Sequence, residues 1–291
     1  MSDPGLDPHA AAWVESLVGR VVAKRRLEGG STSTMLALTP LRGADVVLRV
    51  LDREPWRSHG AALAGRESEV QAMLAHSVVP VPTSVGLDAD GEHCGDAAHL
   101  MTLLPGSVDE TRTDADSLRR LAAVLADIHA VEPTIPVRDY QSWAFEAKYV
   151  VPAWAADPGL WEAAFDLLRS NPVSSQWSLL HRDFHSGNVL WDGDEVSGIV
   201  DWVETSRGPA WLDVAHCCTN LAVRHGEAAA QAFASAYVAG TGRAREAWVE
   251  VMDVVGFLPP PGRSAWPFLA RSGPRSRLEA RLRASMTATG A

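Results

Sequence analysis

The sequence predicts an α+β fold in two lobes, with an antiparallel β-sheet and one helix in the first and mainly helices in the second. Runs of β-type residues separated by turn residues fill the first part of the chain, and helically spaced apolar residues dominate after Gly106. A length of 291 residues suffices for two packed cores. We therefore expect a first lobe over residues 1–104 and a helical second lobe over residues 105–291.

The first lobe is expected to begin with a short helix over residues 9–18, which ends at Gly19. A second helix is predicted over 61–75, with Leu63 and Val70 on one side. The expected strands are rich in β-branched residues and lie at 21–27, 34–39, 46–51, 85–87 and 98–104. The first three form an antiparallel meander, and Pro105-Gly106 marks a break in the chain.

The second lobe shows repeated helical spacing of apolar residues. The expected helices cover 116–130, 143–150, 159–169, 212–225, 227–239, 244–256 and 275–286. The segment 202–209 is expected to be a short loop.

Composition limits the classes of partner. The net charge of −10 and the pI near 5.4 argue against a protein that binds nucleic acid by neutralising phosphates, and they are compatible with a cationic small substrate. Three cysteines without a CxxC pair support neither a disulfide framework nor a cysteine zinc site. Because neither a leader segment nor a membrane span is recognisable, we expect a cytoplasmic protein that does not bind membranes.

The segment 178–201 carries the chemistry. An apolar approach leads to a loop with Asp183 and, five residues on, Asn188. The turn at Asp192-Gly193-Asp194 then folds the following strand back as a hairpin, which ends at Asp201. Asn188 and Asp201 therefore flank the hairpin and should be neighbours in space.

These three residues suit transfer of a nucleotide's terminal phosphoryl group to a hydroxyl. Asp183 can orient the hydroxyl and accept its proton. Asn188 and Asp201 supply the oxygen ligands that Mg²⁺ prefers. The spacing His-Arg-Asp-x-x-x-x-Asn, followed by an aspartate at a strand end, matches the catalytic loop and the metal-binding aspartate of kinases.

A family resemblance extends this interpretation. The sequence resembles the aminoglycoside phosphotransferase and choline kinase-like superfamily, small-molecule kinases with a bilobal, protein-kinase-like fold. The resemblance rests on three motifs in order: His181-x-Asp183-x-His185-x-Gly187-Asn188, Ile199-Val-Asp201-Trp202 and Trp211-Leu-Asp213-Val-Ala215. It implies an N-terminal nucleotide-binding lobe and a substrate cleft in the C-terminal lobe.

The resemblance also assigns roles in the first lobe. Arg49 stands where the kinase pattern has its phosphate-binding lysine, and an arginine fork can hold phosphate oxygens as well. Glu67 would orient Arg49, with Glu69 as the replacement. A glycine-rich turn could present amides and hydroxyls to phosphates, and the peptide backbone at the lobe boundary would contact the nucleotide base. The residues concerned are Gly29, Gly30, Ser31, Met101 and Leu103.

Other residues are expected to support the site. His181 is interpreted as a hydrogen-bonded core residue, and His185 either supports the catalytic loop or contacts substrate. Asp213 is expected to accept loop amide hydrogens, the alternative being an acid at a helix N-terminus. Glu204 is a candidate substrate contact, with a solvated acid as the alternative.

We therefore expect a phosphotransferase that uses ATP or GTP with Mg²⁺. Its acceptor would be an aminoglycoside or another antibiotic, or alternatively choline, an amino sugar or a homoserine-like alcohol. Two functions of other classes stay open. His181, Asp183 and His185, joined by His216, could bind zinc in a hydrolase. Arg49 in place of lysine would fit a catalytically silent nucleotide-binding module.

Overall fold

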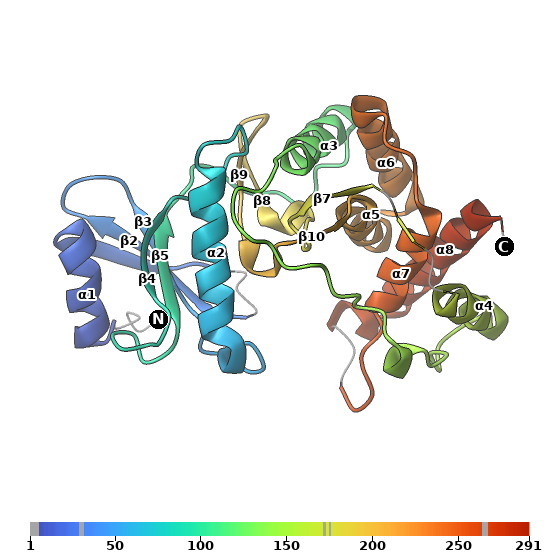
Figure 1. Cartoon of the computed structure of the whole chain (residues 1–291), viewed down its shortest axis with the longest axis horizontal. Helices are drawn as coiled ribbons and strands as arrows, with labels where there is room; N and C mark the ends of the chain where they lie inside the picture. The colour runs from blue at the N-terminus through green and yellow to red at the C-terminus, as the bar shows by residue number, and fades with distance from the viewer. Residues whose placement is uncertain (1–5, 29–31, 171–172, 175, 264–266, 291) are drawn as a thin grey trace. The chain divides into compact units, whose positions relative to one another are not determined.

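The computed structural model describes residues 6–28, 32–170, 173–174, 176–263 and 267–290. The chain divides into two compact units, whose helices and strands are labelled in Figure 1. Unit 1 comprises residues 1–107, 190–193 and 197–205, and unit 2 comprises residues 108–189, 194–196 and 206–291. Unit 1 therefore draws on three separate stretches of sequence.

Unit 1 is built on an antiparallel sheet with a helix on each face (Figure 1). Its strands are hydrogen-bonded in the order β1-β2-β3-β5-β4 and cover Val21–Arg26 (β1), Thr34–Pro40 (β2), Val46–Val50 (β3), Ala98–Thr102 (β5) and Ser84–Asp88 (β4). The helices are α1 (Pro8–Val18) and α2 (Gly60–Leu74), with a 3-10 turn η1 (Arg57–His59) before α2. The predicted meander and both predicted helices are thus confirmed.

The two faces of this sheet carry different side chains because successive residues of a strand point to opposite sides. Leu48 and Leu100 pair across β3 and β5 and pack with Val14 of α1 in an apolar core. The next pair in register, Arg49 and His99, points to the α2 face. Glu67 lies on the buried stripe of α2, and this side of the sheet therefore holds a buried polar cluster.

Unit 2 is a helical assembly around α5 (Trp211–His225), which packs against α6, α7 and α8. Most of the α5 side chains from Trp211 to Val223 are buried, so α5 is a core helix. The other helical elements are α3 (Ala115–His129), η2 (Glu146–Lys148), α4 (Pro158–Arg169), α6 (Glu227–Thr241), α7 (Ala247–Gly256), η5 (Pro267–Ala270) and α8 (Ser272–Thr289).

The predicted hairpin is present. Its strands are β8 (Val189–Asp192) and β9 (Glu195–Ile199), and the two-residue strand β6 (Ser107–Val108) pairs with β8. The 3-10 turn η3 (Ser186–Asn188) precedes the hairpin, and η4 (Trp202–Glu204) follows it. A separate pair joins β7 (Trp177–Leu180) to β10 (Ser206–Pro209) and supports the start of the loop that carries Asp183.

Three local predictions were wrong. The helix expected over 143–150 is reduced to the turn η2, where Lys148 is buried and donates from Nζ to the Gly256 carbonyl at 2.6 Å. The loop expected over 202–209 contains η4 and β10, because β10 pairs with the remote strand β7. Strand β5 ends at Thr102, two residues before the predicted end.

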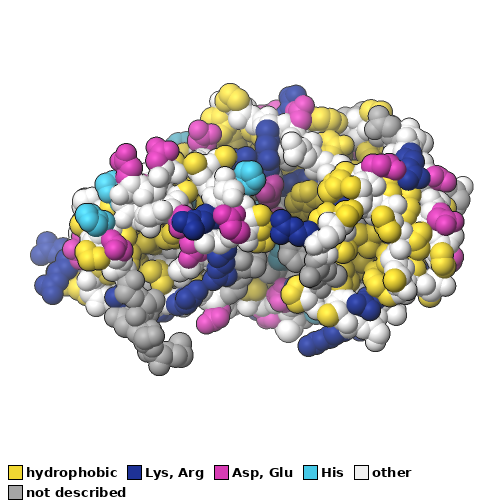
Figure 2. All heavy atoms as spheres, turned by 90° about the horizontal axis from the view of Figure 1, so that it is seen from below, with side chains coloured by type: hydrophobic (Ala, Val, Ile, Leu, Met, Phe, Trp, Pro, Cys, Tyr) yellow, Lys and Arg dark blue, Asp and Glu magenta, His cyan; other side chains and the backbone are white. Residues whose placement is uncertain are grey.

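On the face shown in Figure 2, basic and acidic side chains are interspersed. Large exposed apolar side chains include Val78 and Val173, which are 79% and 87% exposed. Within the described ranges, no helix combines the length and apolar character that crossing a membrane requires.

Candidate active site

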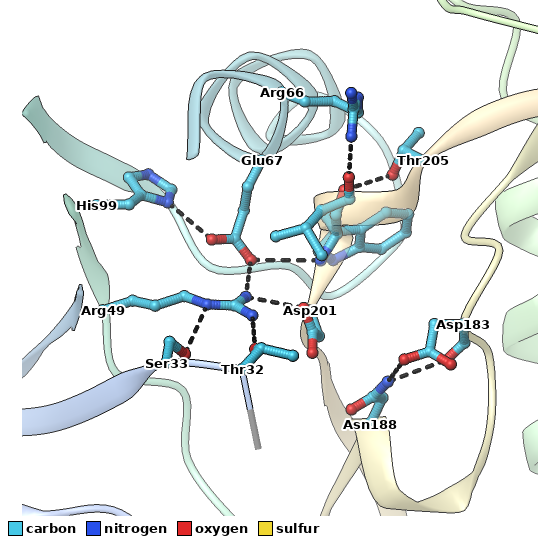
Figure 3. Close-up of polar contacts among 12 residues, drawn as sticks. Thr32, Ser33, Arg49, Arg66, Glu67, His99, Asp183, Asn188, Asp201 and Thr205 are labelled. Atoms are coloured by element: carbon cyan, nitrogen blue, oxygen red, sulfur yellow. Dashed lines mark hydrogen bonds and ion pairs between the residues drawn. The ribbon is translucent and has the colours of Figure 1, made fainter. Parts of the chain in front are cut away.

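Arg49 is the centre of the buried polar cluster in unit 1. Figure 3 shows its guanidinium between Glu67 and Asp201, and its Nη1 lies 2.9 Å from Glu67 Oε1 and 2.8 Å from Asp201 Oδ1. Its Nε donates to Ser33 Oγ and its Nη2 to Thr32 Oγ1, both at 3.1 Å. The arginine fork thus binds four side chains at once, which one lysine ammonium could not do in the same geometry.

Glu67 is held by more than Arg49. His99 Nδ1 lies 3.1 Å from Glu67 Oε2, His99 Nε2 lies 2.9 Å from Ser84 Oγ, and the Trp202 amide donates to Glu67 Oε1 at 3.3 Å. Burial alone would raise the pKa of Glu67, but the Arg49 charge and the hydrogen bond to His99 outweigh it and lower the pKa to about 2. Glu67 is therefore an ionised, buried carboxylate, whereas the alternative Glu69 is exposed.

Asp201 lies just after β9 with a φ of 68°, in the left-handed region. A non-glycine residue there costs free energy and is retained where its surroundings determine the conformation. The surroundings here are the ion pair with Arg49 and the next residue, Trp202, whose buried indole donates to the Ile199 carbonyl at 2.9 Å. The Asp201 side chain is 28% exposed and can still take a ligand.

Gly29, Gly30 and Ser31 lie outside the described residues. The two residues that follow them, Thr32 and Ser33, have hydroxyl oxygens that accept hydrogen bonds from Arg49. Thr32 and Ser33 are therefore anchored to the same arginine that the sequence predicts to bind phosphate.

The predicted base-contacting residues lie at the end of β5. Met101 occupies a central strand, and its buried sulfur accepts from Gln71 Nε2 at 3.4 Å. The Leu103 amide donates to the Asp45 carbonyl at 2.9 Å and is therefore already occupied. Contact of either residue with a nucleotide stays a prediction.

In unit 2, Asp213 supports the loop that carries Asp183. Its carboxylate accepts from the amides of His181 at 2.8 Å and Arg182 at 2.7 Å, which are the loop amides expected from the sequence, and His129 Nε2 lies 3.2 Å away. Burial raises the pKa of Asp213, but the hydrogen bond with His129, the charges of His129 and His181 and the His181 amide outweigh it and lower the pKa. Arg182 itself has a φ of 78°, so Asp213 holds a strained turn in place.

Asp183 and Asn188, which lie on the same loop, are hydrogen-bonded to each other. The Asn188 side-chain nitrogen donates to the Asp183 carbonyl at 2.9 Å and to Asp183 Oδ2 at 3.3 Å. Figure 3 shows the Asn188 oxygen turned away from Asp183. The Asp183 side chain is 33% exposed. Although burial raises the pKa of Asp183, the hydrogen bond from His216 and the charge of His185 lower it overall, so the carboxylate is ionised.

The two loop histidines act within the loop. His181 is fully buried, and its Nδ1 accepts from the Asp183 amide at 3.3 Å. His185 Nδ1 accepts from the Gly187 amide at 3.0 Å, and its Nε2 lies 3.9 Å from Asp183 Oδ1. Burial lowers the pKa of His185. His185 thus lies beside Asp183 while shaping the turn.

Three residues of the site were missed or misassigned by sequence analysis. His99 extends the Glu67 cluster, and Asp253 of α7 contacts His216, which lies 3.1 Å from Asp183 Oδ1. His216 was considered only as a zinc ligand. Its position three residues after Asp213 places both on one face of α5, which was a usable signal. Neither His99 nor Asp253 belongs to a motif.

Two further expectations concern Glu204 and zinc. Glu204 is half-buried in η4, and its contact with substrate stays a prediction. Across the residues that the structure describes, no group of three or more His, Cys, Asp or Glu side chains is arranged to hold a metal ion. The zinc alternative therefore lacks a ligand set here.

Comparison with known proteins finds relatives that match part of this sequence. Homoserine kinase from Methylorubrum populi is 32% identical over 136 residues, which is 42% of this chain and 41% of that protein. Acyl-CoA dehydrogenase family member 10 from Mus musculus is 27% identical over 175 residues, which is 53% of this chain and 16% of that protein. The chain thus spans less than half the length of either relative.

Solved structures match over nearly the whole chain. A putative aminoglycoside phosphotransferase from Ralstonia eutropha has a TM-score of 0.69 at 17% identity, covering 97% of this chain and 98% of that one. A mutant of aminoglycoside phosphotransferase APH(4)-Ia, in complex with ADP and hygromycin B, has a TM-score of 0.62 at 17% identity, covering 94% and 97%. These similarities establish the predicted protein-kinase-like fold. The model of the phosphotransferase enzyme family matches residues 24–248, and this chain belongs to that family.

Proposed function

We propose that this protein transfers the terminal phosphoryl group of ATP or GTP to a hydroxyl of a small molecule. The observation that carries the proposal is the state of Asp183, a partly exposed carboxylate that its neighbours keep ionised and oriented. An oriented carboxylate suits a reaction whose transition state is loose, because catalysis then depends on positioning and on charge neutralisation.

Asp183 would receive the acceptor hydroxyl. His216 Nε2 lies 3.1 Å from its Oδ1, and the Asn188 side-chain nitrogen donates to its Oδ2 at 3.3 Å. The exposed part of the carboxylate can accept the hydroxyl hydrogen, which directs an oxygen lone pair toward the phosphoryl group and gives the proton a destination. His181, His185 and Asp213 would hold the loop in this geometry.

The two side-chain types proposed as metal ligands suit magnesium. The Asn188 nitrogen donates to Asp183, which turns the amide oxygen away from Asp183, and Asp201 would contribute a carboxylate. Both are hard oxygen ligands of the kind that Mg²⁺ selects. A Mg²⁺ ion held by these two side chains would supply positive charge that offsets the charge of the nucleotide phosphates.

Arg49 would bind nucleotide phosphates, with Glu67 fixing its orientation. The pair is buried and braced by His99, so the guanidinium has a defined direction without ligand. The glycine turn of Gly29, Gly30 and Ser31 would supply further phosphate contacts, and Met101 and Leu103 would contact the base. In this scheme residues 1–104 form the nucleotide-binding lobe and residues 105–291 carry the substrate cleft, with Glu204 beside the acceptor.

The acceptor would be an aminoglycoside or another antibiotic. A homoserine-like alcohol is the second candidate, and the 32% identity to homoserine kinase supports it over part of the chain.

The three free thiols, Cys94, Cys217 and Cys218, suit a reducing compartment, and we place the protein in the cytoplasm.

The test is consumption of ATP or GTP with magnesium across a panel of aminoglycosides, macrolides, choline, sugars and homoserine. Asp183→Asn keeps the shape of the side chain, so it should bind nucleotide as the wild type does while losing acceptor-dependent turnover by at least about 100-fold. Turnover that survives in the folded variant would remove Asp183 from the reaction. A protein that binds nucleotide but phosphorylates nothing would favour the silent module.

A further inference from the structure

Asp183, His216 and Asp253 form a chain of side-chain contacts that runs from Asp183 into the core of unit 2. His216 Nε2 is 3.1 Å from Asp183 Oδ1, and His216 Nδ1 is 3.0 Å from Asp253 Oδ1. His216 comes from α5 and Asp253 from α7, and the two helices pack together. The side chains of His216 and Asp253 are 7% and 1% exposed. One imidazole therefore bridges a buried carboxylate and the partly exposed one.

The imidazole is held on its faces as well as at its nitrogens. Trp143 packs edge-on at 5.3 Å between ring centroids, and Phe257 lies 5.4 Å away. Asp253 Oδ2 has no hydrogen-bond partner among the described residues, and Asp253 Oδ1 is hydrogen-bonded to His216 Nδ1 at 3.0 Å. A side chain confined in this way can transmit a fixed orientation to Asp183.

The contacts of His216 allow two protonation states, and the two flanking carboxylates favour the cation. A neutral imidazole that donates from Nδ1 to Asp253 would turn an Nε2 lone pair toward the Asp183 carboxylate, which is repulsive at 3.1 Å. A cation donates from both nitrogens. Burial lowers the pKa of His216, but the charges of Asp253 and Asp183 and their hydrogen bonds outweigh it and raise the pKa to about 10. The competing neutral state would accept at Nε2 from Asn220 Nδ2, which is 3.2 Å away.

We propose that His216, anchored by Asp253, is a positioning residue that binds Asp183 Oδ1 and thereby presents Oδ2 to the acceptor hydroxyl. The inference rests on the proposed phosphoryl transfer. His216 acts through Asp183 and touches neither acceptor nor nucleotide. The pair also accounts for a charged histidine in a helical core, where an unpaired cation would be costly.

Three variants separate positioning from packing. His216→Gln can still donate from its amide nitrogen, whereas His216→Leu fills space without a donor. We expect kcat to fall about 100-fold in His216→Leu and to stay within about tenfold in His216→Gln, with KM for the nucleotide unchanged in both. His225→Gln is the matched control, because His225 is exposed on the same helix.

In Asp253→Asn the measured quantity is the pH dependence of kcat, which a purely structural role of His216 would leave unchanged. The titratable groups near His216 in the described part of the chain include Asp183 and His185 of the loop and Asp253 of α7, and Lys148 interacts with Asp253. Removing the Asp253 charge lowers the pKa of His216, and kcat should then decline as pH rises through that lower value, well before the wild type declines. A pH profile of Asp253→Asn that matches the wild type would overturn the proposal.

Nitrogen NMR of histidine-labelled protein tests the contact between His216 and Asp183 and does not depend on enzymatic activity. The signal that disappears in His216→Gln belongs to His216, and in wild type at pH 8 it should show two protonated nitrogens. Asp183→Asn should shift its titration to lower pH. A neutral His216 at pH 8, or full activity in His216→Leu, would refute the positioning role. If no acceptor is phosphorylated, the proposed function fails, and the NMR titration still upholds or rejects the His216–Asp183 contact.

Discussion

Replacement of Arg49 by methionine is the sharpest perturbation of unit 1. Methionine keeps much of the apolar volume but removes the cation, and it leaves Glu67 ionised in a site where its side chain is 1% exposed. Breaking a buried pair by removing one partner costs about 3–5 kcal/mol. The lowered pKa of Glu67 is of similar size: a change from 4.5 to about 2 corresponds to about 3 kcal/mol, to which Arg49 and His99 both contribute. We expect Arg49→Met to lower the free energy of unfolding by about 3 kcal/mol.

Urea unfolding followed by tryptophan fluorescence measures this change. Adding Glu67→Gln to Arg49→Met should recover part of the loss, because the amide leaves no buried charge without a partner. Arg26→Met is the matched control, since Arg26 is exposed on β1 and its loss should change stability by less than about 0.5 kcal/mol. An Arg49→Met protein as stable as Arg26→Met would refute the reasoning.

The same pair predicts a response to acid. Because the pKa of Glu67 is lowered in the folded state, its contribution to stability is present above its ordinary value of 4.5 and is lost as pH falls toward 2. The difference in unfolding free energy between wild type and Arg49→Met should therefore shrink over that range. A difference that stays constant down to pH 3 would show that the pair is not the source of the stabilisation.

Two further substitutions test the loop of unit 2. Asp213→Ala removes the acceptor for the buried amides of His181 and Arg182, and at about 1–3 kcal/mol for each unsatisfied group we expect about 2–6 kcal/mol of destabilisation in urea unfolding. A loss below 1 kcal/mol would contradict its supporting role. Gly187→Ala places a Cβ 2.6 Å from His185 Cε1, so the imidazole must move. We expect acceptor turnover to fall about tenfold or more with little change in thermal midpoint, and unchanged turnover would remove His185 from the active geometry.

Local sequence patterns predicted most of the strands and helices of both units. The run of β-type residues over 46–51 predicted a strand, and the apolar spacing around Glu67 predicted α2. Both patterns are local, because neighbouring residues share the same backbone conformation. Where contacts were remote, the same method failed. Strand β10 exists by pairing with β7, and the segment around Lys148 is fixed by a bond to Gly256, so nearby residues carry no signal for either.

The sequence by itself determined the family, and it predicted the roles of the loop residues from His181 to Asn188, because a short loop holds its side chains at a spacing that the local backbone sets. It also indicated Arg49 and Glu67 as partners. Only the tertiary structure decided which buried titratable side chains are in contact: His99 with Glu67, and Asp253 with His216. The physical reason is that burial and counter-charge depend on how separate helices and strands pack, and no local pattern records the approach of side chains 37 residues apart.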